Sequence, residues 1–240
     1  MPLLAETGRT DGVVLCWDID GTLLTTNRSG IGAWEQAIRE VCHRSHSLAG
    51  MHTGGVTDVE IAWAILKELA LPPDLNVVER LIARYEFLLP KYLASSGRVL
   101  PGAREFLVWN QKNMGLRCML LTGNTVAGAR AKLENYQLAG FFTRGAFARL
   151  PLGTRSSIAQ EARTIAQAWV GTGFEPRRML VIGDTPHDVN CGRAIGARTL
   201  GVATGNYGTD ALEAAGAWRA VENLPAPEEL ASLSLQTDNE

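Results

Sequence analysis

The chain has 240 residues, which is enough for one large domain or for one domain with a smaller insertion, and either can bury a proper core. It is 46% hydrophobic and 20% charged, the balance of an ordinary soluble globular protein rather than a disordered or fibrous one. Its 23 basic and 25 acidic residues give a net charge of −2, and no stretch gathers Lys and Arg into a basic stripe. Nucleic acid is therefore not an expected partner.

Membrane and secretory signals are not evident in the sequence. The amino terminus lacks the charged head and long apolar run of a signal peptide. No later apolar run approaches the roughly 20 residues that a membrane span requires. The four cysteines are scattered without metal-type spacing, as expected for reduced, buried thiols. We therefore expect a cytoplasmic protein with no membrane partner.

The first apolar run, Val13 to Trp17, is typical of a buried parallel strand. The long interval that follows has helical patterns but no convincing strand, and we expect an all-helical cap over residues 26–97. Its first predicted helix covers about Ile31 to Val41. The second opens at Thr57 with Glu60 three positions later, a capping-box arrangement. The third repeats apolar residues at helical spacing from Val78 to Tyr92.

The remaining segments, residues 1–25 and 98–240, are predicted to form the main domain. Three further apolar runs read as buried strands, Leu116 to Leu121, Met179 to Ile182 and Thr199 to Ala203, and helical patterns alternate with them. The predicted fold is α/β, a doubly wound parallel sheet with a Rossmann-like core and a small helical cap inserted after the first strand. The tail from Pro225 onward could hold one short helix, but we expect it to fray, since its polar end can bury little surface.

Polar residues follow three of these strands at the point where each strand ends. Ligands of open parallel sheets bind outside the carboxyl ends of the strands, so these residues are expected to meet in one crevice. So many carboxylates in one place require a cation, and hard oxygen ligands without a Cys or His cluster suit Mg²⁺. The residues concerned are Asp18, Asp20 and Thr22 after the first strand, Thr122, Gly123 and Asn124 after the second, and Asp184 and Asp188 after the third.

Asp18 and Asp20 are two positions apart, so at an extended strand end both lean to one side. They could then act on opposite sides of one transferring phosphoryl group. That spacing assigns a nucleophile and an acid/base without further residues.

These segments also resemble a known family. DIDGT at residues 18–22, LLTGN at 120–124 and VIGDTPHD at 181–188 are similar to the first, second and fourth signatures of the haloacid dehalogenase superfamily, in the same order. The resemblance covers about Val13 to Leu224, and the place of the insertion resembles the phosphoglycolate phosphatase-like subgroup. It implies that Asp18 is the nucleophile, Asp20 the general acid/base and Thr122 a phosphate ligand. It also implies that Asp18, the main-chain carbonyl of Asp20, and Asp184 hold Mg²⁺, with Asp188 supporting the site.

One position departs from the family pattern. The third signature is usually a Lys that holds the phosphate, and none of the four lysines, Lys67, Lys91, Lys112 and Lys132, is judged suitably placed. Arg155 is the predicted replacement, with Gly123 and Asn124 as further phosphate-binding residues. We expect its side chain to approach Asp18 and Asp188; the alternative is an ordinary solvated charge at a helix start.

The predicted function is a Mg²⁺-dependent phosphatase that hydrolyses a small phosphorylated metabolite, phosphoglycolate-like or a sugar phosphate, through an aspartyl-phosphate intermediate. One alternative is a sugar-phosphate mutase, although the His that such mutases tend to carry after the first signature is not evident. Another is a catalytically weak regulator that binds a phosphorylated ligand. Dehalogenation is less expected because Asp20 is present. The protein is expected to be a monomer or a homodimer.

Overall fold

The computed structural model describes residues 12–51, 53–93 and 97–236. Its centre is a six-stranded sheet in which all neighbouring strands pair in parallel, in the order β5-β4-β1-β6-β7-β8. This confirms the predicted doubly wound α/β fold. The strands are β1 (Val14–Trp17), β4 (Arg117–Leu121), β5 (Gly145–Ala146), β6 (Met179–Gly183), β7 (Arg198–Val202) and β8 (Arg219–Val221).

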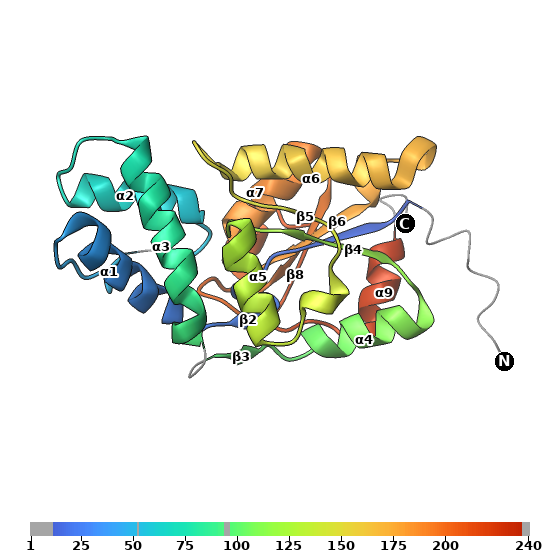
Figure 1. Cartoon of the computed structure of the whole chain (residues 1–240). Helices are drawn as coiled ribbons and strands as arrows, with labels where there is room; N and C mark the ends of the chain where they lie inside the picture. The colour runs from blue at the N-terminus through green and yellow to red at the C-terminus, as the bar shows by residue number, and fades with distance from the viewer. Residues whose placement is uncertain (1–11, 52, 94–96, 237–240) are drawn as a thin grey trace.

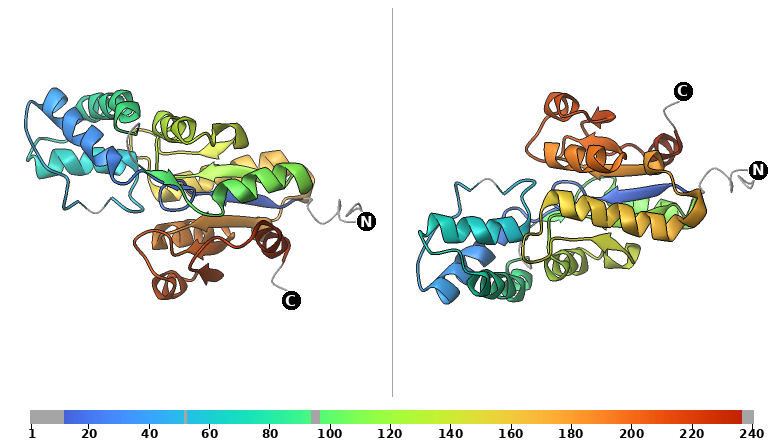
Figure 2. Two further views of the ribbon diagram at one scale, coloured as in Figure 1. Left: turned by 90° about the horizontal axis from the view of Figure 1, so that it is seen from below. Right: turned by 90° about the horizontal axis from the view of Figure 1, so that it is seen from above.

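The two faces of the sheet are covered by different helices. Successive residues of β1 point to opposite faces, so Val14 and Cys16 join one apolar cluster and Leu15 and Trp17 join the other. The first cluster includes residues of α6 (Arg155–Val170) and α7 (Pro186–Ile195). The second includes residues of α4 (Ala103–Asn113), α5 (Val126–Asn135) and α9 (Pro227–Leu235). Figure 2 shows α4 and α9 in front from below, and α6 and α7 in front from above.

Three helices leave the main body between two short strands. β2 (Leu24–Thr25) and β3 (Arg98–Val99) form an antiparallel pair, and between them lie α1 (Ser29–Cys42), α2 (Asp58–Glu68) and α3 (Leu75–Leu93). We call these three helices and their connections the helical insertion. It lies at one end of the molecule (Figure 1). Trp34 stacks on Tyr85 inside it, with ring centroids 4.1 Å apart. The division of the chain into two domains stays a prediction.

The predicted helices of the insertion are all present, and so is the capping box. Thr57 Oγ1 accepts a hydrogen bond from Glu60 N at 3.1 Å, and Glu60 Oε2 accepts one from Thr57 N at 2.9 Å. The start of α2 is thereby fixed by its own sequence. The remaining short elements are α8 (Thr209–Ala214) and the 3₁₀ turns Ala139–Phe141, Gly171–Gly173 and Pro176–Arg178.

The short helix considered for the tail is present as α9, and the expectation that the tail frays is wrong for the described residues. Leu230 in α9 is fully buried on the α4 side of the sheet, and Arg198 Nη2 donates to Ser234 O at 3.0 Å. Apolar residues at helical spacing attach this helix to the core although the segment beyond it is polar. Predictions for the first eleven and last four residues lie outside the described part of the chain. Within the described ranges, every helix is too short or too polar to traverse a lipid bilayer.

Candidate active site

The carboxyl ends of β1, β4 and β6 meet under the helical insertion, at a pocket of about 370 Å³. Thr53, Gly54 and Gly55 of the insertion line its other side. Of the residues predicted from the sequence, six line this pocket, namely Asp18, Asp20, Gly123, Asn124, Arg155 and Asp184. Thr122 and Asp188 are fully buried beside them.

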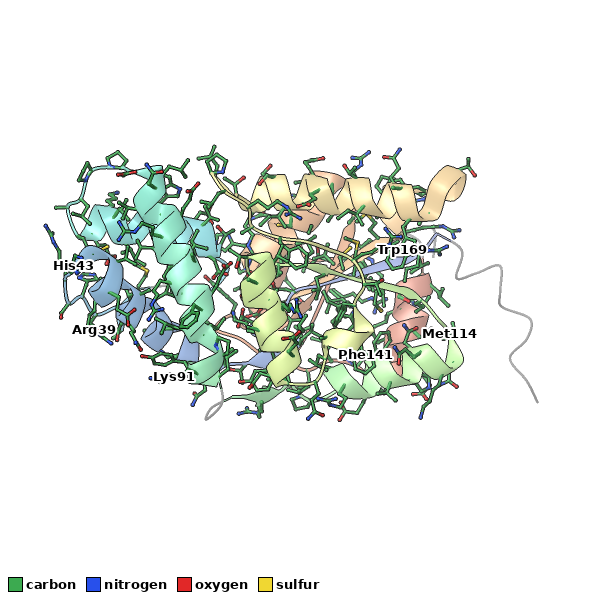
Figure 3. All side chains as sticks on the ribbon, viewed as in Figure 1. Arg39, His43, Lys91, Met114, Phe141 and Trp169 are labelled. Carbon is green, nitrogen blue, oxygen red and sulfur yellow. The ribbon has the colours of Figure 1, made fainter. Side chains whose placement is uncertain are left out.

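A second cavity, of about 190 Å³, lies at the other end of the core. Phe141 and Trp169, labelled in Figure 3, help to line it. Among the described residues around it there is no carboxylate. Of these two cavities, the pocket beside the insertion is therefore the one lined by carboxylates.

Three buried aspartates form a potential metal-binding group. Asp18, Asp184 and Asp188 each offer a carboxylate oxygen, and these oxygens all lie within 4.8 Å of one another. All three donors are hard oxygens, which suits Mg²⁺ better than a thiophilic or imidazole-preferring metal. The carboxylate of Asp20 is not part of this group. A contribution of Asp20 to the metal would therefore come from its main chain.

Burial and mutual repulsion of the three aspartates favour a cation bound between them. Burial, and then the neighbouring charge of Asp188, raise the pKa of Asp18 above its usual value. Burial, Asp188 and Asp18 raise the pKa of Asp184 in the same way. Deprotonated carboxylates at these positions repel one another in a region from which water is largely excluded. A divalent cation would relieve that repulsion, so the residues present fit the metal that the sequence predicts.

Two glycines allow the backbone to pass close to Asp184. A Cβ at Gly205 would lie 1.8 Å from Asp184 Oδ2, and one at Gly21 would lie 2.3 Å from it. Gly21 also has a φ of +89°, which side-chain-bearing residues rarely adopt. The hydroxyl of Thr22 donates to Asp184 Oδ1 at 3.3 Å. The carboxylate of Asp184 is thus surrounded by main chain and held toward Asp18.

Arg155, the first residue of α6, points into the site. Its Nη1 donates to Asp188 Oδ1 at 3.0 Å, and its Nε donates to the carbonyl of Gly55 in the insertion at 2.8 Å. Burial alone would lower the pKa of the guanidinium, but Asp188 and Asp18 raise it above its usual value. The side chain is only 13% exposed, so the alternative of a solvated helix-start charge is wrong.

Asp188 is held on both of its oxygens. The oxygen that does not contact Arg155 accepts hydrogen bonds from Thr185 N at 3.1 Å and Thr185 Oγ1 at 2.7 Å. Thr185 and Asp188 form a capping box at the start of α7. This arrangement fixes the position of Arg155 relative to the aspartates.

Lys132 also lines the pocket, and the sequence analysis did not include it among the candidate site residues. Its Nζ lies 2.5 Å from Asp20 Oδ2 and 2.5 Å from Asn124 Oδ1. Asn124 Nδ2 also donates to Asp20 Oδ2 and to Thr122 Oγ1, each at 2.8 Å. A signal was present in the sequence: Lys132 is a basic residue on the buried stripe of α5, beside Leu133.

The segment after β4 is bonded to the insertion as well as to the core. Asp58 N, at the start of α2, donates to Gly123 O at 2.8 Å, and Thr125 N donates to Asp58 Oδ2 at 2.8 Å. Thr125 Oγ1 donates to Glu86 Oε1 of α3 at 2.5 Å. Burial raises the pKa of Asp58 to about 6, although Lys132 opposes the shift. Two helices of the insertion therefore fix the segment that carries Gly123 and Asn124.

Several known proteins are similar to this chain over most of its length. Over 209 residues the chain is 26% identical to "Probable phosphatase IndB" of Dickeya dadantii (strain 3937), covering 84% of this chain and 86% of that protein. A crystal structure of a hydrolase from Pseudomonas syringae superposes with a TM-score of 0.69 at 22% identity, covering 92% of this chain and 96% of the other.

Two further solved structures share the fold. One, from Haemophilus somnus 129PT, is described as a predicted phosphoglycolate phosphatase and gives a TM-score of 0.70 at 16% identity, covering 93% of this chain and 98% of that one. The other, from Thermotoga maritima, is described as a "putative beta-phosphoglucomutase". It gives a TM-score of 0.61 at 19% identity, covering 92% of this chain and 97% of that one. The family model of haloacid dehalogenase-like hydrolases matches residues 15–193, the stretch that carries all three signature segments. The chain belongs to the haloacid dehalogenase-like hydrolase family.

Proposed function

We propose that this protein is a Mg²⁺-dependent phosphatase that hydrolyses a small phosphorylated metabolite through an aspartyl phosphate on Asp18. The observation that carries the proposal is the buried group of Asp18, Asp184 and Asp188 at the pocket, with Arg155 bonded to it. Carboxylates in this arrangement supply both a nucleophile and a place for a cation. The family, and a curated relative assigned as a phosphatase, support the same reaction.

In the first step, a carboxylate oxygen of Asp18 attacks phosphorus in line with the ester bond. The bond from phosphorus to the leaving oxygen breaks, and Asp20 gives that oxygen a proton. In the second step Asp20 takes a proton from water, which attacks the same phosphorus. The bond to Asp18 breaks, and inorganic phosphate leaves with both carboxyl groups restored.

Positive charge is needed throughout these steps. Mg²⁺ held by Asp18, Asp184 and the main-chain carbonyl of Asp20 would neutralise the carboxylates and the phosphate oxygens. Arg155 offers guanidinium hydrogens beside the same place, and Thr122, Gly123 and Asn124 form the segment against which the phosphate lies. In this proposal Arg155 takes the role that the family usually gives to Lys.

The helical insertion acts as a cap over this site. Its residues complete the pocket, and Gly55 is bonded to Arg155. A volume of about 370 Å³ with polar and charged lining suits a small polar ester, phosphoglycolate-like or a sugar phosphate. The cap excludes bulk water, which strengthens the interactions of the phosphate with its cations.

The test is release of inorganic phosphate from a panel of phosphorylated metabolites with Mg²⁺, with EDTA, and with the Asp18→Asn variant. We expect turnover only with Mg²⁺ and with the wild-type carboxylate. Asp210→Asn, at an exposed position in α8, is the matched control and should keep full activity. Wild-type turnover by Asp18→Asn would exclude the covalent mechanism.

The two alternatives give different products in the same assay. A sugar-phosphate mutase would return the phosphoryl group to the substrate, so it would form an isomer without stoichiometric phosphate. A regulator would bind substrate without turnover, which equilibrium binding would show. Either result in the wild-type protein would replace the phosphatase proposal.

A further inference from the structure

Lys132 has an environment that requires an explanation. It is 5% exposed, whereas the other three lysines of the chain, Lys67, Lys91 and Lys112, are exposed. Burying an ammonium group costs several kcal/mol unless it is paired and hydrogen-bonded, on the order of the stability of a whole domain. Its ammonium group contacts two residues of the candidate active site, Asp20 through Oδ2 and Asn124 through Oδ1.

Two hydrogen-bond donors contact the same carboxylate oxygen of Asp20. Oδ2 accepts a hydrogen bond from Lys132 Nζ at 2.5 Å and a second from Asn124 Nδ2 at 2.8 Å. The Asp20 side chain nevertheless stays 40% exposed, and it lines the pocket. One oxygen is therefore held at the wall by two donors while the carboxyl group remains accessible to a ligand.

Lys132 and Asn124 also hold each other. The Asn124 side chain accepts from Lys132 through Oδ1 and donates through Nδ2 to Asp20 and Thr122. Three side chains thus form a closed set of hydrogen bonds, and rotation of any one of them would break at least two contacts. Such a set fixes a side chain more precisely than an ion pair on the surface does.

The donor character of both partners decides which oxygen of Asp20 can carry a proton. A Lys ammonium and an amide NH₂ group only donate, so a proton on Oδ2 would face two other donors. A proton carried by this carboxyl group is therefore confined to Oδ1. We propose that Lys132 is a positioning residue for Asp20, which together with Asn124 holds Oδ2 so that Oδ1 exchanges the proton with the leaving group and with water. This inference rests on the proposed phosphatase function.

A different role for Lys132 would be simple charge balance or direct attraction of the phosphate. Either role would affect all substrates alike. A role that acts through proton transfer affects esters according to their leaving group, because an alkyl alkoxide needs a proton as it departs and a nitrophenolate hardly does. The leaving-group dependence therefore separates positioning from the other two roles.

The experiment compares Lys132→Met with wild type on the best alkyl phosphate substrate and on p-nitrophenyl phosphate, both with Mg²⁺. We expect kcat/KM for the alkyl ester to fall roughly 10²-fold, the lower range of general acid catalysis, and kcat/KM for the aryl ester to fall less than about tenfold. The ratio kcat/KM reports phosphoryl transfer to Asp18 and not the later hydrolysis step, which is the same for both esters. Lys132→Arg keeps a donor and should recover part of the loss. Lys112→Met, on the exposed side of α4, should behave as wild type.

A double-mutant cycle with Asp20→Asn gives a second readout. If Lys132 acts through Asp20, adding Lys132→Met to Asp20→Asn should change kcat/KM for the alkyl ester less than about twofold, since the effects of residues that act as a unit are not additive. Thermal unfolding of each variant checks that the fold is kept.

Equal losses of kcat/KM for both esters, or a full additional loss in the Asp20→Asn background, would overturn the positioning role while leaving the phosphatase intact. A wild-type protein that releases no phosphate from any ester would remove the proposed function, and this inference with it.

Discussion

Arg155 joins the core to the insertion through two hydrogen bonds of its guanidinium group. Its Nη1 is used by Asp188 and its Nε by Gly55 O, so the direction of the guanidinium plane is set from the core and from the insertion together. A planar group with five donors can keep these contacts and still offer hydrogens to a phosphate, which a point charge on a flexible stem does less precisely. An Arg is thus a suitable substitute where the family usually has Lys.

The Arg155→Ala variant should lose phosphate affinity and turnover together. We expect kcat/KM to fall roughly 10² to 10³-fold, the range for removing one group that stabilises transition-state charge. Arg155→Lys should recover part of the activity because the charge is kept. Arg149→Ala, whose side chain is 59% exposed, is the control. Steady-state kinetics on one good substrate measure all three, and full activity of the alanine variant would remove Arg155 from the site.

Residues that directly follow a strand were predictable, and so was Arg155 at the start of a helix, whereas Lys132 within a helix was not. Asp18, Asp20 and Asp184 meet because parallel strands bring their carboxyl ends to one edge. Lys132 comes from the middle of a helix, two turns beyond its start. Whether a basic residue there is buried depends on how α5 packs, which a single sequence does not specify. Its distance along the chain from Asp20 gave no hint of the 2.5 Å contact.

Among the elements, the long apolar strands were predicted to within a residue or two, and the edge strands were missed. β5 has two residues and β8 has three, and neither contains an apolar run. Their pairing depends on the neighbouring strand, Leu120 with Gly145 in one case and Leu200 with Arg219 in the other. Short edge strands are therefore defined by tertiary context more than by propensity.

Asp58, the first residue of α2, makes the stability of the protein depend on pH. Burial raises the pKa of Asp58 from 3.8 to about 6, so the folded protein binds this proton more tightly than the unfolded chain does. The contribution of Asp58 to stability is then most favourable below about pH 4, declines as the pH rises through about 6, and is constant above that.

Asp58→Asn should remove this pH dependence. The amide keeps an acceptor oxygen for Thr125 N but cannot ionise. We expect the variant to match wild type near pH 4 and to exceed it by on the order of 2 kcal/mol at pH 7.5, as measured by urea unfolding. Asp74→Asn is the matched control, since Asp74 also accepts from a backbone N–H near a helix start but is exposed. A constant difference between wild type and Asp58→Asn across this range would contradict the expectation.

At the scale of the whole molecule, the site exists only where the insertion and the core meet. Helical patterns predicted the three helices of the insertion and their place between the first and second signature segments. They did not predict that Asp58 and Glu86 would bond to the segment after β4, or that Gly55 would bond to Arg155. These contacts join residues from 39 to 100 positions apart along the chain. Such pairings follow from the shape of both bodies rather than from local sequence pattern.

The grouping of buried aspartates also makes the stability of the whole protein depend on the proposed Mg²⁺. Without a cation, the raised pKa values of Asp18 and Asp184 mean that stability falls as the pH rises from about 4 through the folded-state pKa values, because the folded state must give up protons that it binds more tightly than the unfolded chain. A metal that binds only the folded protein reverses this loss.

We therefore expect Mg²⁺ to raise the midpoint of thermal unfolding, and to raise it more at pH 8 than at pH 5, where protons compete for the same carboxylates. At a concentration 100 times the dissociation constant, binding adds about 2.7 kcal/mol, which for a chain of this size shifts the midpoint by roughly 5 to 10 °C. Asp184→Asn should be at least as stable as wild type in EDTA, since one repelling charge is gone, but it should gain little from Mg²⁺. Asp210→Asn, exposed on α8, should keep the full shift. Differential scanning calorimetry with and without Mg²⁺ measures these midpoints without any substrate. An equal shift in Asp184→Asn and wild type would place the metal elsewhere, and no shift in wild type at millimolar Mg²⁺ would argue against a magnesium site among these aspartates.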